Sequence, residues 1–506
     1  MGGPPHRFER QPGTRLVRLG QDRRRPQGSG YLDISSGLWY FQPQFQSRPL
    51  EPMEASFSEK PLDIRFCLSR ATSFRYVKKK SLAVARFGGI IQKVQENILM
   101  VSSNDYGPKK VQNLKPLKQE VCWAVDRLVE PLIDLSRQIH KTPELSFTEH
   151  KAVSLISGMM QAAGFELVHN LTDLETAFRA IHPARSPGPT VAFLAEYDAL
   201  PGLGHACGHN IIAATAVGAT LAVGALKERL PGTLQLIGCP AEEKGGGKII
   251  MVERGGFKDI DVAMMIHPGS KNAGTEKSLT LDPLEITFKG KGSHASASPE
   301  LGVKALSAII QTFNGINTQR EHLIPGASIH GIITQGGERT NVVPELAQCR
   351  FSIRAPSVVH RDELVTKLKN CAKGAALATG CKVKFGYFDL AYEPMRINSP
   401  LEHAFLANLE WLGLEISRTI KQGRGSIDVA NVSQVIPTLR GSVAIVPQEI
   451  KFHTAEFAEA AFSDTGMQAM IHGAKALAMT AVDVLWSEEL QNQIKQCFET
   501  PGGGVR

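Results

Sequence analysis

Residues 202–210, GLGHACGHN, place two imidazoles and a thiol within five positions, at His205, Cys207 and His209. A cysteine and a histidine two residues apart are suited to hold a metal ion, although a lone cysteine is more often a small buried apolar side chain. A redox pair is excluded, because no second cysteine lies nearby in the sequence. The stretch therefore predicts part of a metal site, provided that other segments supply the remaining ligands.

Two later segments contain further ligand types. Glu242 and Glu243 lie in CPAEEKGGG, and His267 lies in MMIHPG. Each is ambiguous alone, because paired glutamates usually face solvent and a histidine at a strand end usually has a structural role. Together with Cys207 and His209, however, they complete a set of thiolate, imidazole and carboxylate groups that is typical of a zinc site.

Adjacent glutamates can also divide the chemical work. If Glu243 binds metal, Glu242 lies beside the attacking water and can take its proton. Two ions in such a set would activate water and clamp a tetrahedral intermediate, with the Cys207 thiolate lying between them. The GGGK run at 245–248 resembles a phosphate-binding loop, but Glu242 stands where the first glycine of G-x-x-x-x-G-K-S/T belongs.

The elements that must position these groups alternate along the chain. Apolar and β-branched runs at 190–198, 233–239 and 260–267 predict buried strands. An Ala-rich helix that ends before residues 231–232 and a short helix at 247–254 separate them. Strands alternating with helices form a parallel sheet covered on both faces, which binds ligands beyond the carboxyl ends of its strands. We therefore expect the candidate ligands, which follow these strands, to converge at one edge.

A second pattern interrupts the first. Its order of strand, helix, strand, strand, helix and strand predicts the split βαβ plan of a ferredoxin-like domain. The predicted strands are 284–291, 328–334, 346–354 and 381–388, and the predicted helices are 301–320 and 361–379. The predicted fold class is therefore α/β: a catalytic domain with a central, mostly parallel sheet flanked by helices, interrupted by a ferredoxin-like α+β lid domain.

The domain limits follow from these patterns. Apolar residues at helical spacing from Val121 to Ile139 open the first domain, and a helix at 473–485 closes it. We expect an N-terminal extension at 1–115, mostly disordered, a catalytic domain in two parts at 116–283 and 394–488, the lid domain at 284–393, and a C-terminal tail at 489–506.

Charge is unevenly distributed along the chain. The net charge is +8, but residues 1–115 contain 20 Lys and Arg against 9 Asp and Glu, and the remainder contains 37 against 40. A mildly acidic body with a basic arm argues against nucleic acid as a partner.

The apolar run at 211–226 is short for a membrane span. Eight cysteines are too few for a disulfide scaffold, which favours a cytoplasmic protein. The Arg-rich residues 1–30 make a mitochondrial protein the less favoured alternative.

Several motifs together resemble one family. HACGH, PAEE-x-GGGK, the strand-end His267, SHASASP at 293–299, TNVVPE at 340–345 and FHTAEF at 452–457 are similar to the aminoacylase and carboxypeptidase family of dinuclear zinc peptidases. They most resemble its amidohydrolase branch, and the resemblance covers residues 117–488. It implies two divalent ions, Zn²⁺ first and Mn²⁺ or Co²⁺ as alternatives. The metal ligands that it implies are Cys207, His209, Glu243, His267 and His453.

The same resemblance assigns the remaining site residues. It implies that Glu242 is the general base and acid, and that Asp198 orients a metal ligand. It implies a homodimer formed through the lid domain, in which His294 reaches the partner's active site and stabilises the oxyanion. Asn341 and Arg354 stand at positions that can meet a substrate carboxylate, although Arg354 could equally be a structural salt-bridge partner.

Departures from the branch narrow the expected function. Asn210 replaces the usual aspartate after His209, and 425–431 reads GSIDVAN where GSTDFGN is expected. One dipeptidase member shares that asparagine and matches more closely in EYDALPGLGHACGHN and FSIRAPS. This match implies hydrolysis of dipeptides with a C-terminal Lys, Arg or ornithine, such as β-alanyl-lysine. The alternatives are an amidohydrolase of N-acyl amino acids and a non-catalytic metal-binding relative.

Overall fold

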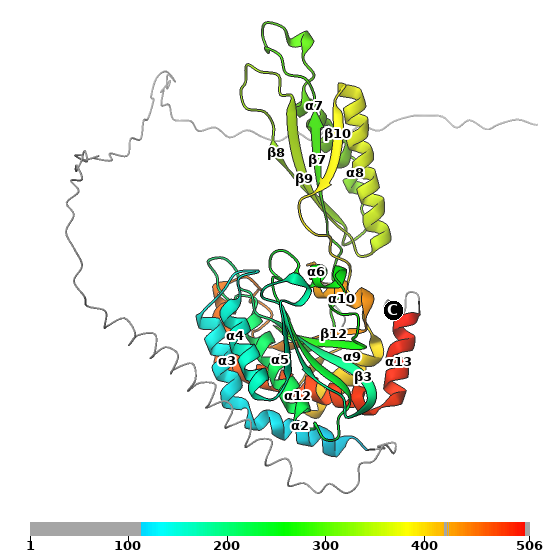
Figure 1. The fold of residues 1–506 in the computed structure, drawn as a ribbon. Coiled ribbons are helices and arrows are strands. Elements are labelled where there is room, and N and C mark those ends of the chain that lie inside the picture. Colours follow the sequence, from blue (N-terminus) through cyan, green and yellow to red (C-terminus); the bar gives the residue numbers. More distant parts are fainter. Residues whose placement is uncertain (1–112, 419–422, 424, 501–506) are drawn as a thin grey trace, which may run out of the picture. The chain divides into compact units, whose positions relative to one another are not determined.

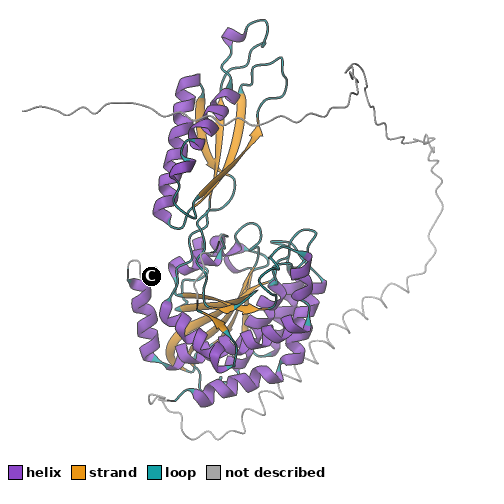
Figure 2. Ribbon diagram, turned by 180° about the vertical axis from the view of Figure 1, so that it is seen from behind, coloured by secondary structure: helices purple, strands orange, loops and turns teal. Residues whose placement is uncertain are grey.

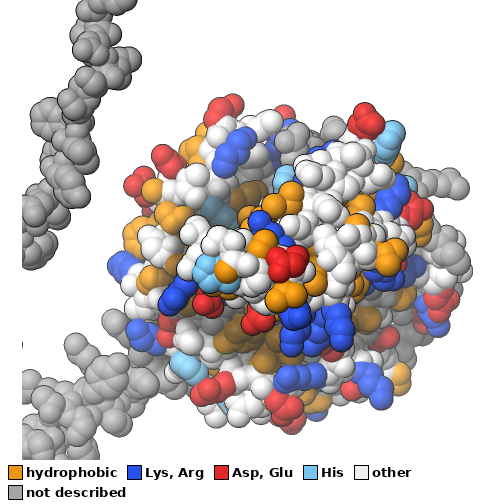
Figure 3. All heavy atoms as spheres, turned by 90° about the horizontal axis from the view of Figure 1, so that it is seen from above, with side chains coloured by type: hydrophobic (Ala, Val, Ile, Leu, Met, Phe, Trp, Pro, Cys, Tyr) orange, Lys and Arg blue, Asp and Glu red, His pale blue; other side chains and the backbone are white. Residues whose placement is uncertain are grey.

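The structure is a computed structural model that describes residues 113–418, 423 and 425–500 (Figure 1). The basic N-terminal arm and its expected disorder therefore lie outside the described residues. Among the described helices, none combines the length and the apolar character that crossing a bilayer requires. On the face drawn in Figure 3, acidic and basic side chains are interspersed with apolar ones.

An eight-stranded sheet organises the larger part of the described chain. Its order is β1-β2-β4-β3-β5-β12-β6-β11, and the four central strands β4, β3, β5 and β12 run parallel to one another. β1 and β2 are antiparallel additions at one side. The bounds are β1 Glu166–His169, β2 Phe178–His182, β3 Ser186–Glu196, β4 Pro231–Cys239, β5 Val262–Gly269, β6 Asn272–Ala273, β11 Ile416–Ser417 and β12 Thr438–Ala444.

Helices cover this sheet on both faces (Figure 2). Alternation along β3 explains why both faces need covering: Val191, Phe193 and Ala195 enter one buried cluster, whereas Ala192 and Leu194 enter another. The helices are α2 Lys115–Arg127, α3 Val129–Lys141, α4 His150–Ala162, α5 His209–Gly224, α6 Gly247–Glu253, α9 Ser399–Trp411, α10 Val429–Val435, α11 Ala455–Ala460, α12 Asp464–Trp486 and α13 Glu488–Glu499. The predicted α/β class is confirmed.

Three local predictions need correction. The helical pattern from Val121 to Ile139 is divided at Leu128 into α2 and α3. The Ala-rich helix α5 ends at Gly224, and Pro231 begins β4 rather than closing the helix. The segment beyond Glu488, expected to be a tail, contains α13, which is anchored because Ile494 is buried and its carbonyl accepts a hydrogen bond from the Asn398 amide at 2.9 Å.

The interrupting segment forms a separate four-stranded antiparallel sheet of order β10-β7-β9-β8. Its elements follow the predicted split βαβ order. They are β7 Asp282–Lys289, α7 Ala305–Asn317, β8 Ser328–Gln335, β9 Leu346–Arg354, α8 Val358–Thr379 and β10 Lys382–Tyr387. Phe288 and Phe351 are buried against the helices, whereas Ile332 and Ile333 on the edge strand β8 are 63% and 46% exposed.

Candidate metal centre

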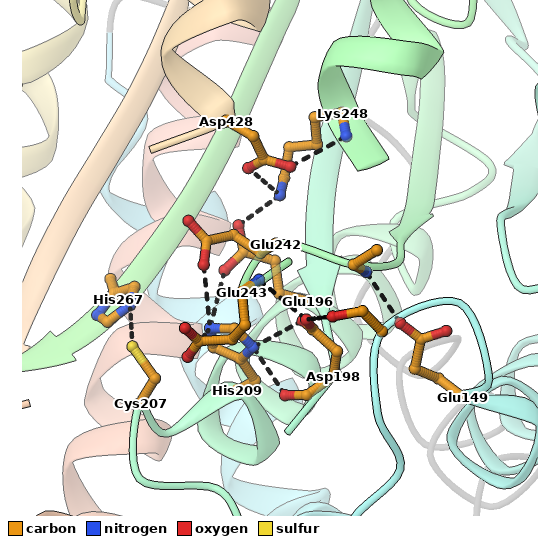
Figure 4. Close-up of polar contacts among 12 residues, drawn as sticks. Glu149, Glu196, Asp198, Cys207, His209, Glu242, Glu243, Lys248, His267 and Asp428 are labelled. Carbon is orange, nitrogen blue, oxygen red and sulfur yellow. Dashed lines mark hydrogen bonds and ion pairs between the residues drawn. The ribbon is translucent and has the colours of Figure 1, made fainter. Parts of the chain in front are cut away.

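The candidate ligands lie at the carboxyl ends of the parallel strands, as expected for an open sheet (Figure 4). Asp198 lies two residues beyond the end of β3, Glu243 follows β4, and His267 lies within the last part of β5. Cys207 precedes α5, and His453 precedes α11. Because β4, β3 and β5 are neighbours and parallel, segments far apart in the sequence meet at one edge.

The turn before α5 brings Cys207 to His267. Gly208 has φ +77°, and a Cβ atom there would collide with the ring of Pro268, so the close approach requires glycine. The Cys207 Sγ atom lies 3.5 Å from Nε2 of His267, and both side chains are buried. Nδ1 of His267 lies 2.7 Å from the Pro268 carbonyl, to which it donates, so Nε2 is directed toward the thiol as a free acceptor.

Asp198 fixes two of the predicted ligands at once. Its Oδ1 atom and its own carbonyl each lie 2.9 Å from Nδ1 of His209. Its Oδ2 atom accepts hydrogen bonds from the Ser146 hydroxyl at 2.9 Å and the Glu243 backbone N–H at 3.0 Å. Burial raises the pKa of Asp198, but His209 and these donors outweigh it and lower the pKa to about 2. The carboxylate therefore stays ionised and orients the His209 ring.

Glu243 lies between two histidines. Its Oε1 atom is 3.8 Å from Nε2 of His209, and its Oε2 atom is 3.4 Å from Nε2 of His453. The backbone N–H of His453, a residue with φ +64°, donates to the Ala206 carbonyl at 3.0 Å. The His453 side chain is 52% exposed, whereas that of His209 is fully buried. The site therefore has one closed side and one side open to solvent.

These groups fit a pair of metal ions. Nε2 of His209 and Oε1 of Glu243 are buried without a hydrogen-bond partner, an arrangement that is costly unless a cation satisfies both. Ligand atoms within 4.8 Å of one another form three overlapping groups, and Cys207, His209 and Glu243 each belong to two of them. The groups are Cys207, His209 and His267; Cys207, Glu243 and His453; and His209, Glu242 and Glu243.

Glu242 faces the same cluster. Its Oε2 atom lies 4.0 Å from Nε2 of His209, and 15% of its side chain is exposed. Burial, followed by the negative charges of Asp428 and Glu196, raises the pKa of Glu242 well above its ordinary value. A carboxyl group with a raised pKa beside a cation site is suited to accept and return a proton.

Three predicted residues lie outside this cluster. His294 is exposed, and its Nδ1 atom accepts a hydrogen bond from the Ala297 backbone N–H at 3.2 Å. Asn341 is also exposed. Nη1 of Arg354 donates to the Ser426 hydroxyl at 2.6 Å, so this arginine contacts the divergent 425–431 segment. Within the described part of a single chain, no hydrogen bond or ion pair joins these three side chains to the predicted ligands.

His205, the histidine of GLGHACGHN without an expected role, is buried inside the fold. Its ring packs against that of His140 with centroids 5.9 Å apart. Burial, with the neighbouring imidazoles of His209 and His140, lowers the pKa of His205 to about 3. The ring is therefore neutral at physiological pH, and its observed contact is packing.

Two groups of contributing residues were not predicted from the sequence. Glu149 is buried and accepts hydrogen bonds from the Ala241 backbone N–H at 2.9 Å and the Thr176 hydroxyl at 2.7 Å, which fixes Ala241 at φ +59° before Glu242. No sequence signal marks this glutamate. The other group comprises Glu196, Lys248 and Asp428, which lie in EYDALPG, GGGK and GSIDVAN. Those motifs could have drawn attention to them.

Comparisons with known proteins agree with this geometry. Residues 192–482 match the sequence profile of peptidase family M20/M25/M40. A Xaa-Arg dipeptidase of Mus musculus is 36% identical over 408 residues, which cover 78% of this chain and 94% of that protein. One of the subunits of the p-aminobenzoyl-glutamate hydrolase of Escherichia coli is 34% identical over 321 residues, covering 58% of this chain and 66% of that protein.

Solved structures share the fold. A Bacillus subtilis protein described as a dinuclear metal-binding peptidase from the M20 family superposes with a TM-score of 0.57 at 23% identity, covering 71% of this chain and 99% of that one. Given this fold, the convergent ligand groups and the sequence match, the chain belongs to peptidase family M20/M25/M40 and is a hydrolase of the metallopeptidase class.

Proposed function

We propose that this protein is a metal-dependent dipeptidase that hydrolyses small dipeptides with a basic C-terminal residue: Lys, Arg or ornithine. The observation that carries the proposal is the position of Glu242 beside His209 and Glu243, two residues that each belong to two of the overlapping groups of ligand atoms. Two relatives that are matched over most of their own length, from mouse and human, are Xaa-Arg dipeptidases. β-Alanyl-lysine is a representative substrate.

The proposed cofactor is a pair of divalent ions held by Cys207, His209, Glu243, His267 and His453. A thiolate combined with imidazoles favours Zn²⁺, with Mn²⁺ or Co²⁺ as alternatives. The ions would polarise the scissile carbonyl and make water more acidic. Cys207 belongs to two ligand groups, which supports a bridging role for its sulfur.

The remaining chemistry belongs to this chain's own residues. Glu242 takes a proton from the attacking water and returns it to the leaving amine, and Asp198 keeps His209 and Glu243 in place. Asn341 and Arg354 hold the substrate's carboxylate. For Arg354 this requires the guanidinium to share its hydrogen bonds between Ser426 and substrate.

We also propose a homodimer formed through the lid domain. β8 is an edge strand with the exposed apolar side chains Ile332 and Ile333, and an unpaired apolar edge favours pairing with another strand. His294 makes no hydrogen bond or ion pair with the cluster of its own described chain, so His294 of the partner subunit stabilises the oxyanion. Among the described residues, no two cysteines form a disulfide bond, which supports a cytoplasmic protein.

A substrate panel tests the function. Purified protein loaded with Zn²⁺ should hydrolyse β-alanyl-lysine and alanyl-arginine at least about 10-fold faster, in kcat/KM, than N-acetyl-lysine or N-benzoyl-glutamate. The reverse order would favour an amidohydrolase of N-acyl amino acids, a candidate supported by the 34% identity to the p-aminobenzoyl-glutamate hydrolase subunit. Two bound ions without hydrolysis of any compound would indicate a non-catalytic member of the family.

A further inference from the structure

The lysine of the GGGK run has a partner other than phosphate. Lys248 is fully buried in the first turn of α6, and its Nζ atom lies 2.6 Å from Oε1 of Glu196 and 2.7 Å from Oδ1 of Asp428. Its backbone N–H also donates to Oδ2 of Asp428 at 3.0 Å. Two carboxylates inside the fold occupy this ammonium group, so it is not free to bind a phosphate.

A buried ion chain of this kind is a poor source of stability. Removing three charges from water is costly, and apolar side chains of similar volume often stabilise a fold equally well. The side chains of Glu196, Lys248 and Asp428 are at most 2% exposed. A better explanation for the three charges is that they hold one of the two carboxylates in a fixed position.

That carboxylate is Glu196, the last residue of β3. Lys248 holds its Oε1 atom, whereas its Oε2 atom is buried and has no hydrogen-bond partner among the described residues. Oε2 lies 3.7 Å from Nε2 of His209, which is itself buried without a hydrogen-bond partner. Figure 4 shows Glu196 between the Lys248–Asp428 pair and the His209 ring.

The distances suit two ligands of one ion. Two ligand atoms at about 2.0–2.2 Å from a tetrahedral zinc ion lie roughly 3.4 Å from each other. Nε2 of His209 lies 3.7 Å from Oε2 of Glu196 and 3.8 Å from Oε1 of Glu243. All three atoms lack a hydrogen-bond partner, so the requirement for a cation is the same for Glu196 as for Glu243.

We infer that Glu196 supplies a further carboxylate ligand to an ion bound by His209, and that Lys248 holds it there by its other oxygen. The inference rests on the metal centre of the proposed function, but not on the identity of its substrate. Lys248 prevents Glu196 from turning away and leaves only Oε2 free, so Glu196 acts as a single-oxygen ligand.

Metal affinity tests this role without reference to turnover. The Glu196→Gln variant keeps an oxygen for Lys248 but replaces the second oxygen with an amide nitrogen, which is not a zinc ligand. In competition with a chromophoric chelator at constant pH, it should bind one of the two Zn²⁺ ions about 10–100-fold more weakly than the unaltered protein. Its Co²⁺-loaded form should also show a changed visible absorption spectrum.

Two further variants separate ligation from charge and from folding. Glu196→Asp keeps the negative charge but shortens the side chain, so a ligand role predicts at least about 10-fold weaker binding, whereas a purely electrostatic role predicts no change. Asp428→Asn alters the same ion chain without touching Glu196, and should keep both ions within a few-fold of the original affinity even if it lowers the melting temperature.

The outcomes are distinct. The inference is overturned if Glu196→Gln and Glu196→Asp bind both ions with the original affinity and give the original Co²⁺ spectrum. It is also overturned if Asp428→Asn weakens metal binding as much as Glu196→Asp does. Disruption of the buried charges, rather than loss of a ligand atom, would then explain the lower affinity. Failure to hydrolyse dipeptides while the predicted affinity changes occur would reject the proposed function and leave this ligand assignment standing.

Discussion

Oδ1 of Asp198 and the carbonyl oxygen of the same residue both lie 2.9 Å from Nδ1 of His209, so one residue holds the imidazole with two acceptors. This fixes the proton on Nδ1 and leaves Nε2 directed at the carboxylates of Glu242 and Glu243. The other carboxylate oxygen of Asp198 fixes the Glu243 backbone. A single side chain therefore sets the relative position of two candidate ligands.

Asp198→Asn should weaken metal binding without abolishing folding. The amide can still accept from Nδ1 of His209, but its NH₂ group then faces the Glu243 N–H and the Ser146 hydroxyl, two groups that donate to the carboxylate. We expect the affinity for at least one ion to fall about 10–100-fold in a chelator competition assay. Asp134→Asn, at an exposed position on α3, should keep the original affinity. Equal affinities in the two variants would remove Asp198 from the metal site.

Glu242→Gln should keep both metal ions and lose most of the turnover. The substitution preserves size but removes the basic oxygen, and general acid–base catalysis contributes about 10²–10⁴-fold to rate. The decisive measurements are kcat with β-alanyl-lysine and metal content by elemental analysis. Glu253→Gln, at an exposed position on α6, provides the matched control. Turnover like that of the control would show that another group moves the proton.

Metal binding should release protons at neutral pH. Burial raises the pKa of the Cys207 thiol to about 12, and Asp198 outweighs burial and raises that of His209 above its ordinary value, so both are protonated in the metal-free protein. Burial lowers the pKa of His267, which has no proton to lose. Because protonation competes with the ions, affinity should rise from about pH 6 to about pH 8 and fall as the pH is lowered.

Calorimetry in buffers with different heats of ionisation measures the released protons. At about pH 7 the unaltered protein should release about one proton more than Cys207→Ser, whose hydroxyl stays protonated. Equal proton release by the two proteins would mean that Cys207 does not bind metal as a thiolate.

Subunit mixing tests the proposed dimer. If His294 acts in the site of the partner subunit, Glu242→Gln and His294→Ala homodimers are each inactive, but a mixed dimer contains one site with both groups intact. After subunit exchange, an equimolar mixture should recover about one quarter of the original activity, because half of the dimers are mixed and each has one complete site. A mixture as inactive as its components, with exchange shown by labelled subunits, would contradict the shared site.

Size measurement gives an independent check of the same interface. Ile332→Lys places a charge on the exposed apolar face of β8, which opposes edge-to-edge pairing. Light scattering should then report a monomer with an unchanged circular dichroism spectrum. A variant that stays dimeric and fully active would exclude this edge as the interface.

The amino-acid sequence by itself determined the ligand types, the alternation of strands and helices, and the split βαβ order of the insert. These are local properties: a buried strand is visible as an apolar run, and the candidate ligands Cys207 and His209 lie two residues apart. The rule that ligands bind at the carboxyl ends of parallel strands then placed Glu243 and His267 at one edge. Residue spacing along the chain was sufficient for these predictions.

Only the tertiary structure decided which distant groups meet. The Cys207–His267 contact depends on the order β4-β3-β5 in the sheet, and the Lys248–Asp428 pair joins residues 180 positions apart. Glu149 gave no signal because one glutamate in a polar stretch resembles any solvent-exposed residue until the fold buries it. Burial and pairing arise from packing between elements, whereas a sequence pattern reports only the preferences within each element.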